Sequence, residues 1–440
     1  MLENVLFALE VLDNSLWAYA ALPSLLILGF YFSFWTNFVQ FRKFPLIFRS
    51  FRKLLFHRNT ENKTGVHPLK AFFTCISGCT GIGNVVAICT AVQIGGPGAL
   101  FWIWICAIAG SILKYSEVYL GLRYRETCAK GRYQGGPMYF LKRVYKAPFI
   151  PKLMCVLLCI YGVEIYQFSV VTHTVTANLG INKFLVVIPL VALVVCISSG
   201  GVNRVGRICS FVVPCFIVVY VFMGAWVLIQ NITQVPAVIS LIISSAFTGH
   251  AGVGAFAGSS VLITMTQGIR RGCYSGDVGV GYASVIHSES NEKIPERQAS
   301  LAIFEIFLDS FLVCTTSVFI VLLTGVWQEP IEASLLVQKG LEQHFPFMDY
   351  FMPFFLFLLG YSTVLAYFCT GIKCAEHLSP TWGRYIYYGY AMIALFIFSF
   401  IEMYQALIVM SITGGLLLVI NLYGIFRLRH EISFDIPASP

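Results

Sequence analysis

The chain has 440 residues, of which 58% are hydrophobic and only 11% are charged. Soluble domains contain about 25% charged residues, so this composition excludes an ordinary soluble domain and predicts an all-α polytopic membrane protein in contact with lipid. The net charge of +8 does not indicate nucleic-acid binding, because membrane topology explains an excess of Lys and Arg.

Eleven apolar segments are long enough, or nearly so, to cross a hydrocarbon core, which requires about 20 helical residues. They cover residues 17–39, 72–92, 99–121, 153–178, 184–199, 207–230, 238–264, 299–325, 350–371, 385–401 and 404–426. We expect a single transmembrane domain over residues 1–440, in which 17–39 is an extra helix and 427–440 is a cytoplasmic tail. The acidic amino terminus lacks the basic region of a cleavable signal peptide, so we expect it to be retained.

The connection after the first segment contains eight Lys and Arg residues. Because cytoplasmic loops are enriched in these residues, we place this connection in the cytoplasm. The later Lys and Arg residues then fall mostly on the same side, including those of 123–152 and 270–297, and leave Lys183 and Lys339 outside. We therefore expect an external amino terminus and a cytoplasmic carboxyl terminus.

Glycines interrupt the second segment. Gly78, Gly81 and Gly83 lie within six residues, with Thr80 and Asn84 beside them. Each glycine in a helix interior costs about 1 kcal/mol relative to alanine, so the cluster predicts a break. An unsatisfied backbone group in lipid costs several kcal/mol, and we therefore expect the unwound peptide to line a binding site near the bilayer midplane.

The seventh segment, 238–264, has a similar cluster that includes Thr248, Gly249, Gly252, Gly254 and Gly258. Segments that start at 99, 184 and 207 have counterparts that start at 299, 385 and 404, an offset of about 200 residues. Five segments separate the two interrupted ones, and an odd number of crossings reverses direction. The pattern predicts a 5+5 inverted repeat over 72–230 and 238–426, with a broken helix at the start of each half.

A helix break offers free N–H groups with partial positive charge and free C=O groups with partial negative charge. A zwitterionic amino acid carries both complementary charges. We expect its carboxylate on N–H groups around Gly81 to Asn84 and its ammonium near Gly252 to Phe256. Isolated glycines more often allow close helix packing, but two broken helices in corresponding positions favour a binding site.

Oxygen-bearing residues near the breaks also suit a cation. A Na⁺ ion prefers about five or six hard oxygen ligands. The carbonyls of Ser77 and Thr80, with the hydroxyls of Ser362 and Thr363 in GYSTVLAYF, can supply them. The sequence therefore predicts Na⁺ as the coupling ion.

Four acidic residues fall within apolar segments: Glu117, Glu164, Glu305 and Asp309. Glu117 and Asp309 lie toward helix ends, where a satisfied or interfacial carboxylate is the simpler interpretation. Glu164 lies near mid-segment, and H⁺-coupled symport through Glu164 is an alternative to Na⁺ coupling. An ion channel is a second alternative, which the inverted duplication disfavours.

Enzyme motifs are absent from the sequence. It contains no GxSxG, HExxH or Walker motif, so we expect neither catalysis nor transport driven by ATP.

Several motifs occur together along the chain: GIGNVVAICTAVQIGGPGA, AFTGHAGVGAFAGSS and RGCYSGDVGVGYASVIHSES. This combination resembles the alanine/glycine:cation symporter family, bacterial Na⁺-coupled carriers of small neutral amino acids with a LeuT-type fold. The resemblance implies a bacterial inner-membrane carrier of alanine or glycine. It assigns substrate contacts to Gly81, Gly83, Asn84, Phe256, Thr363 and Tyr367, and the cation to Ser77, Thr80, Ser362 and Thr363.

The chain departs from the family pattern at two places. Tyr367 replaces the tryptophan that is usual in the ninth helix, and YQFSVVTHT replaces the usual Asn and Gln pattern of the fourth. Gln167 and His173 are therefore the polar candidates for substrate binding there. One methylene in a pocket is worth only about 1–3 kcal/mol, so the sequence does not select among small amino acids.

Overall fold

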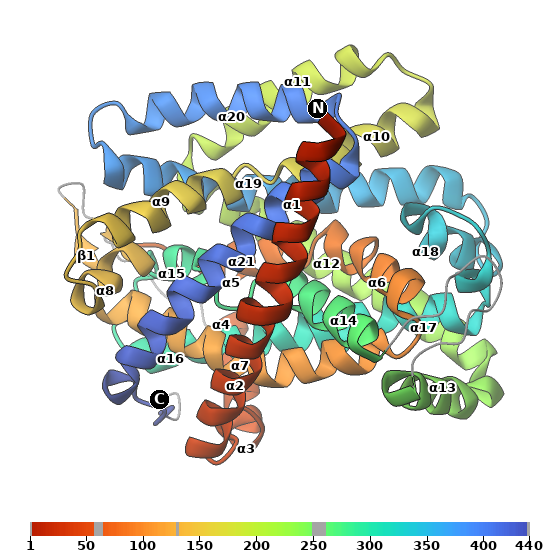
Figure 1. The fold of residues 1–440 in the computed structure, drawn as a ribbon, viewed down its shortest axis with the longest axis horizontal. Coiled ribbons are helices and arrows are strands. Elements are labelled where there is room, and N and C mark those ends of the chain that lie inside the picture. The colour runs from red at the N-terminus through yellow and green to blue at the C-terminus, as the bar shows by residue number, and fades with distance from the viewer. Residues whose placement is uncertain (1, 57–64, 129–131, 249–260, 438–440) are drawn as a thin grey trace.

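The computed structural model of the protein describes residues 2–56, 65–128, 132–248 and 261–437. Within these ranges the chain is almost entirely helical, and the only strands are β1 (Glu126–Thr127) and β2 (Tyr133–Gln134), which pair antiparallel. The helices pack together in one bundle (Figure 1), and their buried side chains form a continuous hydrophobic core. The expected all-α architecture is confirmed.

Seven helices of the described residues are long and apolar enough to cross a membrane, and a bent pair of helices raises this number to eight. The protein is therefore a multi-pass membrane protein. The predicted count of eleven is not confirmed. Two predicted segments correspond to helices of at most 17 residues, α11 (Lys183–Ser198) and α20 (Gly383–Ser399).

The amino-terminal helix starts earlier than the sequence predicts. α1 (Leu2–Leu16), the π-helical turn η1 (Trp17–Ala21) and α2 (Leu22–Trp35) follow one another without interruption. Asp13 of α1 is buried because it pairs with Arg270, and the Trp17 indole N–H donates to the carbonyl of Ser411 at 3.2 Å. The long helix crosses the carboxyl-terminal helix α21 (Met403–Arg427), as Figure 1 shows.

The second predicted segment is broken where its glycines occur. α5 (Pro68–Cys79) ends there, the 3-10 turn η2 (Ile82–Asn84) follows, and α6 (Ala87–Gly95) resumes at a bend of 48°. Gly78 allows the close approach of Tyr282, whose hydroxyl a Cβ at this position would overlap. The predicted break is confirmed.

The other discontinuous helix differs from the prediction. α13 (Val235–Thr248) is followed by α14 (Val261–Gly276), a break at 277–281 and the short helix α15 (Tyr282–His287). The glycines at 249–258 lie outside the described residues. The assignment of 270–297 to a connection is wrong for residues 270–290, because these residues are buried among helices.

The two discontinuous helices run in opposite senses. α6 packs against α14, and α5 packs against α15, so the first half of each helix contacts the second half of the other. Their breaks, at Thr80 and Asp277, are about 200 residues apart, which is the spacing expected for an inverted repeat. The repeat bounds themselves remain a prediction.

Other helices complete the bundle around this pair. Near the amino terminus lie α3 (Val39–Arg42) and the amphipathic α4 (Phe44–Phe56). Between the discontinuous helices come α7 (Ala99–Arg123), α8 (Pro137–Val144), α9 (Phe149–Tyr161), α10 (Ile165–Leu179), α11, α12 (Gly201–Gln230) and η3 (Ile232–Gln234). After them come α16 (Pro295–Ile306), η4 (Phe307–Cys314), α17 (Thr315–Leu323), η5 (Val326–Gln328), α18 (Ala333–Glu342), α19 (Met348–Leu378), α20, α21 and η6 (Arg429–Glu431).

Candidate functional site

The break in α5 lies against α10 and α19. The N–H of Gly81 donates to Asn84 Oδ1 at 3.0 Å, and the N–H of Ile82 donates to Gln167 Oε1 at 3.0 Å. A Cβ on Gly81 would lie 2.6 Å from Thr363 Oγ1 and 2.9 Å from Gln167 Oε1. Only glycine fits here, and the structure brings three predicted site residues, Gly81, Gln167 and Thr363, into contact.

Asn84 points from the same break toward α14 and the π-helical turn η4. Its Nδ2 lies 2.5 Å from Asp309 Oδ1 and 3.3 Å from Ser275 Oγ, and Ser275 donates to Asp309 Oδ2 at 3.0 Å. Gly83 lies beside Tyr274 and Ser275. Of the two interpretations given for Asp309, satisfied or interfacial, the structure supports the satisfied carboxylate, since Asp309 is fully buried beside the break and accepts from Asn84 and Ser275.

The predicted cation ligands lie where α5 meets α19. Thr363 Oγ1 donates to the carbonyl of Ser77 at 2.8 Å. Ser362 is buried and donates to the carbonyl of Leu359 at 2.8 Å. The hydroxyls of Ser77 and Thr80 are buried without a hydrogen-bond partner among the described residues. Such buried, uncompensated oxygens fit a hard cation, which would accept their lone pairs.

Tyr367 contacts the break between α14 and α15. Its hydroxyl donates to Asp277 Oδ1 at 3.0 Å, and its ring stacks on Tyr282 with centroids 4.1 Å apart. Asp277 is fully buried and left-handed, with φ of 50°, and its Oδ2 has no hydrogen-bond partner among the described residues. Asp277 is not predicted from the sequence, because the pattern around it is that of a loop.

A third interruption separates α9 from α10. Glu164 adopts the left-handed conformation there, with φ of 51°, and its carboxylate accepts the Tyr274 hydroxyl at 3.1 Å. Glu164 is fully buried and contacts α14 through this bond. The sequence places Glu164 inside a continuous segment and does not predict this break.

The remaining predicted site residues are less closely connected. His173 lies almost two turns beyond Gln167 on α10, is partly exposed, and makes no side-chain hydrogen bond to a described residue. Gly252 and Phe256 lie outside the described residues. Their roles stay predictions.

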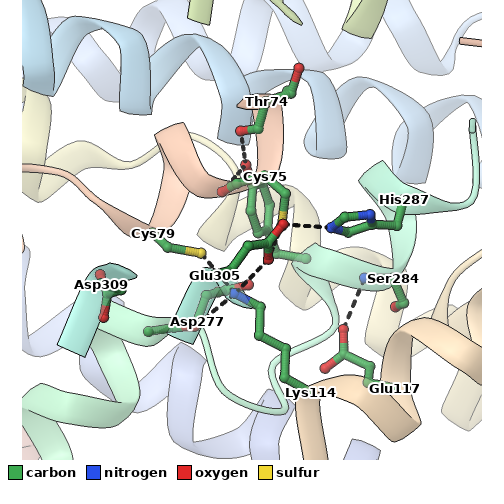
Figure 2. Close-up of polar contacts among 12 residues, drawn as sticks. Thr74, Cys75, Cys79, Lys114, Glu117, Asp277, Ser284, His287, Glu305 and Asp309 are labelled. Carbon is green, nitrogen blue, oxygen red and sulfur yellow. Dashed lines mark hydrogen bonds and ion pairs between the residues drawn. The ribbon is translucent and has the colours of Figure 1, made fainter. Parts of the chain in front are cut away.

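Glu117 is a satisfied structural carboxylate. It accepts the N–H groups of Gly281 at 3.1 Å and Ser284 at 3.0 Å, where α15 begins, and the amide of Asn421 at 3.0 Å. Figure 2 shows it pointing at Ser284. The satisfied-carboxylate interpretation is confirmed for Glu117.

Lys114, which is fully buried near both breaks, is another site residue that was not predicted from the sequence. Its Nζ contacts Glu305 Oε2 at 3.1 Å, and Figure 2 shows the ammonium pointing toward Cys79 and Glu305. A lysine in the middle of the apolar segment 99–121 was the available signal, since ionisable residues at such depth are functional candidates.

Together these contacts define a class of protein. Two oppositely directed discontinuous helices surround a buried centre that offers N–H donors, unpaired hydroxyls and a carboxylate. Such an arrangement is characteristic of secondary transporters with a LeuT-type fold.

The chain belongs to the sodium:alanine symporter family, whose model matches residues 2–436. Membership of this family of transporters implies that the protein is a carrier rather than an enzyme.

Two bacterial or archaeal relatives cover most of the chain. The uncharacterized transporter YflA of Bacillus subtilis is 31% identical over 389 residues, covering 86% of this chain and 81% of YflA. The sodium/alanine symporter AgcS of Methanococcus maripaludis is 27% identical over 390 residues, covering 86% and 84%.

Solved transporter structures share the fold. The structure of MhsT in complex with L-phenylalanine has a TM-score of 0.54 at 13% identity, covering 81% of this chain and 89% of MhsT. A Na⁺-coupled sialic acid symporter has a TM-score of 0.50 at 8% identity, covering 84% and 79%. The predicted fold class is confirmed.

Proposed function

We propose that the protein is a Na⁺-coupled symporter of a small neutral amino acid, of the size of alanine or glycine, which works by alternating access. The proposal rests on one observation: one side of the buried centre attracts negative charge and the other side attracts positive charge. Backbone N–H groups lie at one break and the Asp277 carboxylate at the other. The substrate that matches both is a zwitterion.

Gln167 indicates how the carboxylate is held. Its Oε1 accepts the N–H of Ile82 at 3.0 Å, next to the N–H of Gly81. An arriving carboxylate is a stronger acceptor than an amide oxygen, because a charged acceptor roughly doubles the strength of a hydrogen bond. In the proposed complex the carboxylate takes the position of Gln167 Oε1, and the Gln167 side chain turns its amide N–H toward the substrate.

Asp277 is the proposed partner of the substrate ammonium. A buried carboxylate oxygen without a hydrogen bond carries a large desolvation cost, and an ammonium group offsets that cost. Tyr367 holds the other oxygen at 3.0 Å and so fixes the direction of Oδ2. The proposal thereby gives Tyr367 an orienting role.

Aromatic rings limit the size of the substrate. The ring of Tyr367 lies 4.1 Å from that of Tyr282 and 5.5 Å from that of Tyr161. The rings of Tyr282 and Tyr161 are both fully buried. A compact side chain fits this arrangement better than a long one.

The coupling ion is proposed to bind where α5 meets α19. Ser77, Thr80, Ser362 and Thr363 supply oxygens from both helices. A cation there joins the broken helix to α19 and stabilises the break that binds the substrate. The coupling is reciprocal, so substrate raises Na⁺ affinity by the same factor. The carboxylate of Asp309 and the hydroxyl of Ser275 form a second oxygen cluster that can bind the ion, and the amide nitrogen of Asn84 donates to this carboxylate.

We further propose a bacterial inner-membrane location with the amino terminus outside. Lys114, Arg270 and Arg271 are buried inside the bundle and do not report on topology. The positive connection after the first helix, with Arg49, Arg52 and Lys53 exposed on α4, still supports a cytoplasmic position there.

Uptake of labelled alanine and glycine into proteoliposomes tests the function. Accumulation is expected with an inward Na⁺ gradient and is expected to stop when choline replaces Na⁺. Saturable countertransport of unlabelled substrate separates a carrier from a channel. Uptake that is equal with and without the Na⁺ gradient contradicts Na⁺ symport.

Glu164 supports H⁺ coupling as a second candidate function. Its buried carboxylate lies at a third helix break and contacts α14 through Tyr274. H⁺ coupling predicts that acid outside drives uptake without Na⁺, and that Glu164→Gln loses accumulation while it keeps exchange. Na⁺ coupling predicts that Glu164→Gln still accumulates substrate in a Na⁺ gradient.

A further inference from the structure

Lys114 lies between the two discontinuous helices and bonds to both of them. Its ammonium lies 3.0 Å from Cys79 Sγ, 3.0 Å from the carbonyl oxygen of Gly276 and 3.1 Å from Glu305 Oε2. An ammonium has three N–H donors, and here each has one acceptor. Figure 2 shows this ammonium reaching from α7 into the centre of the cluster.

Two of these acceptors occupy equivalent places in the fold. Cys79 is the last residue of α5, and Gly276 is the last residue of α14. The carboxyl-terminal end of a helix carries partial negative charge and carbonyls without intrahelical partners. The first halves of both discontinuous helices therefore end on the same positive charge.

Glu305 balances that charge and connects it to α15. Glu305 Oε1 lies 2.8 Å from His287 Nε2, and His287 Nδ1 lies 2.7 Å from Gln298 Nε2. Gln298 Nε2 also donates to the carbonyl of Pro68 at 3.3 Å, which can only accept. The amide orientation is therefore fixed, His287 Nδ1 accepts, and the proton of a neutral imidazole lies on Nε2.

This tautomer bears on whether Cys75, His287 and Glu305 form a metal site. Cys75, His287 and Glu305 have ligand atoms within 4.8 Å of one another, which is a spacing compatible with a metal ion. However, Nε2 uses its hydrogen on Glu305, and Lys114 already supplies a positive charge to that carboxylate. The bonding pattern matches a cation site that is occupied by a side chain.

We propose that Lys114 is a resident cation that fixes the relative position of the two helix breaks and occupies the place of an additional coupling ion between them. The inference rests on the proposed transport function. Lys114 is a positioning residue, which acts through Cys79 and Gly276. Shortly after Cys79 come Gly81 and Ile82, whose N–H groups are proposed to bind the substrate. Directly after Gly276 comes Asp277.

The first test compares Lys114→Met with the double variant Lys114→Met/Glu305→Gln, which removes both charges together. The measurement is equilibrium binding of labelled alanine in saturating Na⁺ to detergent-purified protein of full length. We expect the double variant to be monodisperse and to bind alanine at least tenfold more weakly than the wild type. Wild-type affinity in the double variant overturns the proposal, because the lysine would then only neutralise Glu305.

The second test uses Lys114→Ala and a free cation. Removal of the side chain leaves the carbonyl of Gly276 and the carboxylate of Glu305 facing an open position. We expect ammonium chloride, but not choline chloride at equal ionic strength, to raise the melting temperature of this variant and to leave the wild type unchanged. Equal melting temperatures of the variant in the two salts overturn the proposal.

The two tests fail independently of the proposed function. If the wild type neither binds nor transports alanine in Na⁺, the function is wrong, and the melting experiment still reports on the cation position. If the wild type transports alanine while the double variant matches it, the role of Lys114 is wrong and the function stands.

Discussion

The side-chain oxygen Oε1 of Gln167 lies 3.0 Å from the backbone nitrogen of Ile82, immediately after the extended break residue Gly81. The bond joins α10 to a peptide group that has no partner of its own within the helix. A neutral side chain thus holds the N–H that we assign to the substrate carboxylate.

Replacement of this amide by a permanent carboxylate should block the substrate. In Gln167→Glu the fixed charge competes for the same N–H, so we expect alanine affinity to fall at least tenfold. Gln167→Ala removes the competing oxygen together with the amide that faces the substrate, so we expect a smaller fall in alanine affinity. Competition binding with labelled alanine measures both, and a Gln167→Glu variant with wild-type affinity contradicts the carboxylate assignment.

Gly81 should tolerate no side chain. A Cβ there would lie 2.6 Å from Thr363 Oγ1, whereas a Cβ on Gly389 in α20 would meet no heavy atom within 4 Å. We expect Gly81→Ala to insert in the membrane but to lose at least 90% of alanine uptake. Gly389→Ala is the matched control and should transport like the wild type.

Asp277 should be essential for substrates that carry an ammonium group. Its neutral variant Asp277→Asn keeps the shape of the side chain but lacks the charge, so we expect the KM for alanine to rise at least a hundredfold. Tyr367→Phe removes only the bond to Oδ1 and should raise KM about tenfold, which corresponds to about 1.4 kcal/mol. Uptake at graded alanine concentrations distinguishes the two variants. Equal KM values for Asp277→Asn and the wild type contradict the ammonium assignment.

Thr363 should control the response to Na⁺. Thr363→Val has the same shape but no hydroxyl, so it loses the oxygen that lies 2.8 Å from the Ser77 carbonyl oxygen. We expect the Na⁺ concentration for half-maximal uptake to rise at least tenfold. Thr363→Ser keeps the hydroxyl and should stay within about threefold of the wild type. A normal Na⁺ response in Thr363→Val would contradict this position and indicate that the ion binds at the cluster around Asp309.

The extra amino-terminal helix should contribute to stability through one buried ion pair. Asp13 and Arg270 are 3% and 7% exposed, and loss of one partner from a buried pair costs about 3–5 kcal/mol. We expect Asp13→Asn to lower the melting temperature by several degrees. Asp435→Asn makes the same change in an exposed pair with Lys43 at 3.9 Å and should have almost no effect. Similar melting temperatures for both variants contradict a stabilising role of α1.

Local composition predicted one discontinuous helix and missed the other. The glycines of α5 interrupt an otherwise apolar segment, so propensity alone locates the break. In α14 and the break that follows it, the charges of Arg270, Arg271 and Asp277 lower the hydropathy, and the segment looks like a loop. Its burial depends on partners such as Asp13, more than 250 residues away in sequence, which no local pattern reports.

The candidate site divides in the same way. Gly81 and Thr363 were predicted from helix breaks and from family motifs, and the structure brings them together. Asp277, Lys114 and the Glu164 break were not predicted, because their positions depend on how helices meet in three dimensions. Apolar runs indicate which segments enter the membrane, but not which buried charges face one another.

Trp17 gives the amino-terminal helix a practical use. Its buried indole hydrogen-bonds the carbonyl of Ser411 and lies 5.9 Å from the guanidinium of Arg270 on α14. Indole emission shifts to longer wavelength when water reaches the ring, and it also changes when a nearby charge moves. A variant that retains Trp17 as its sole tryptophan therefore carries a label-free optical sensor of α14, and stopped-flow fluorescence can time the rocking of this helix during each transport cycle.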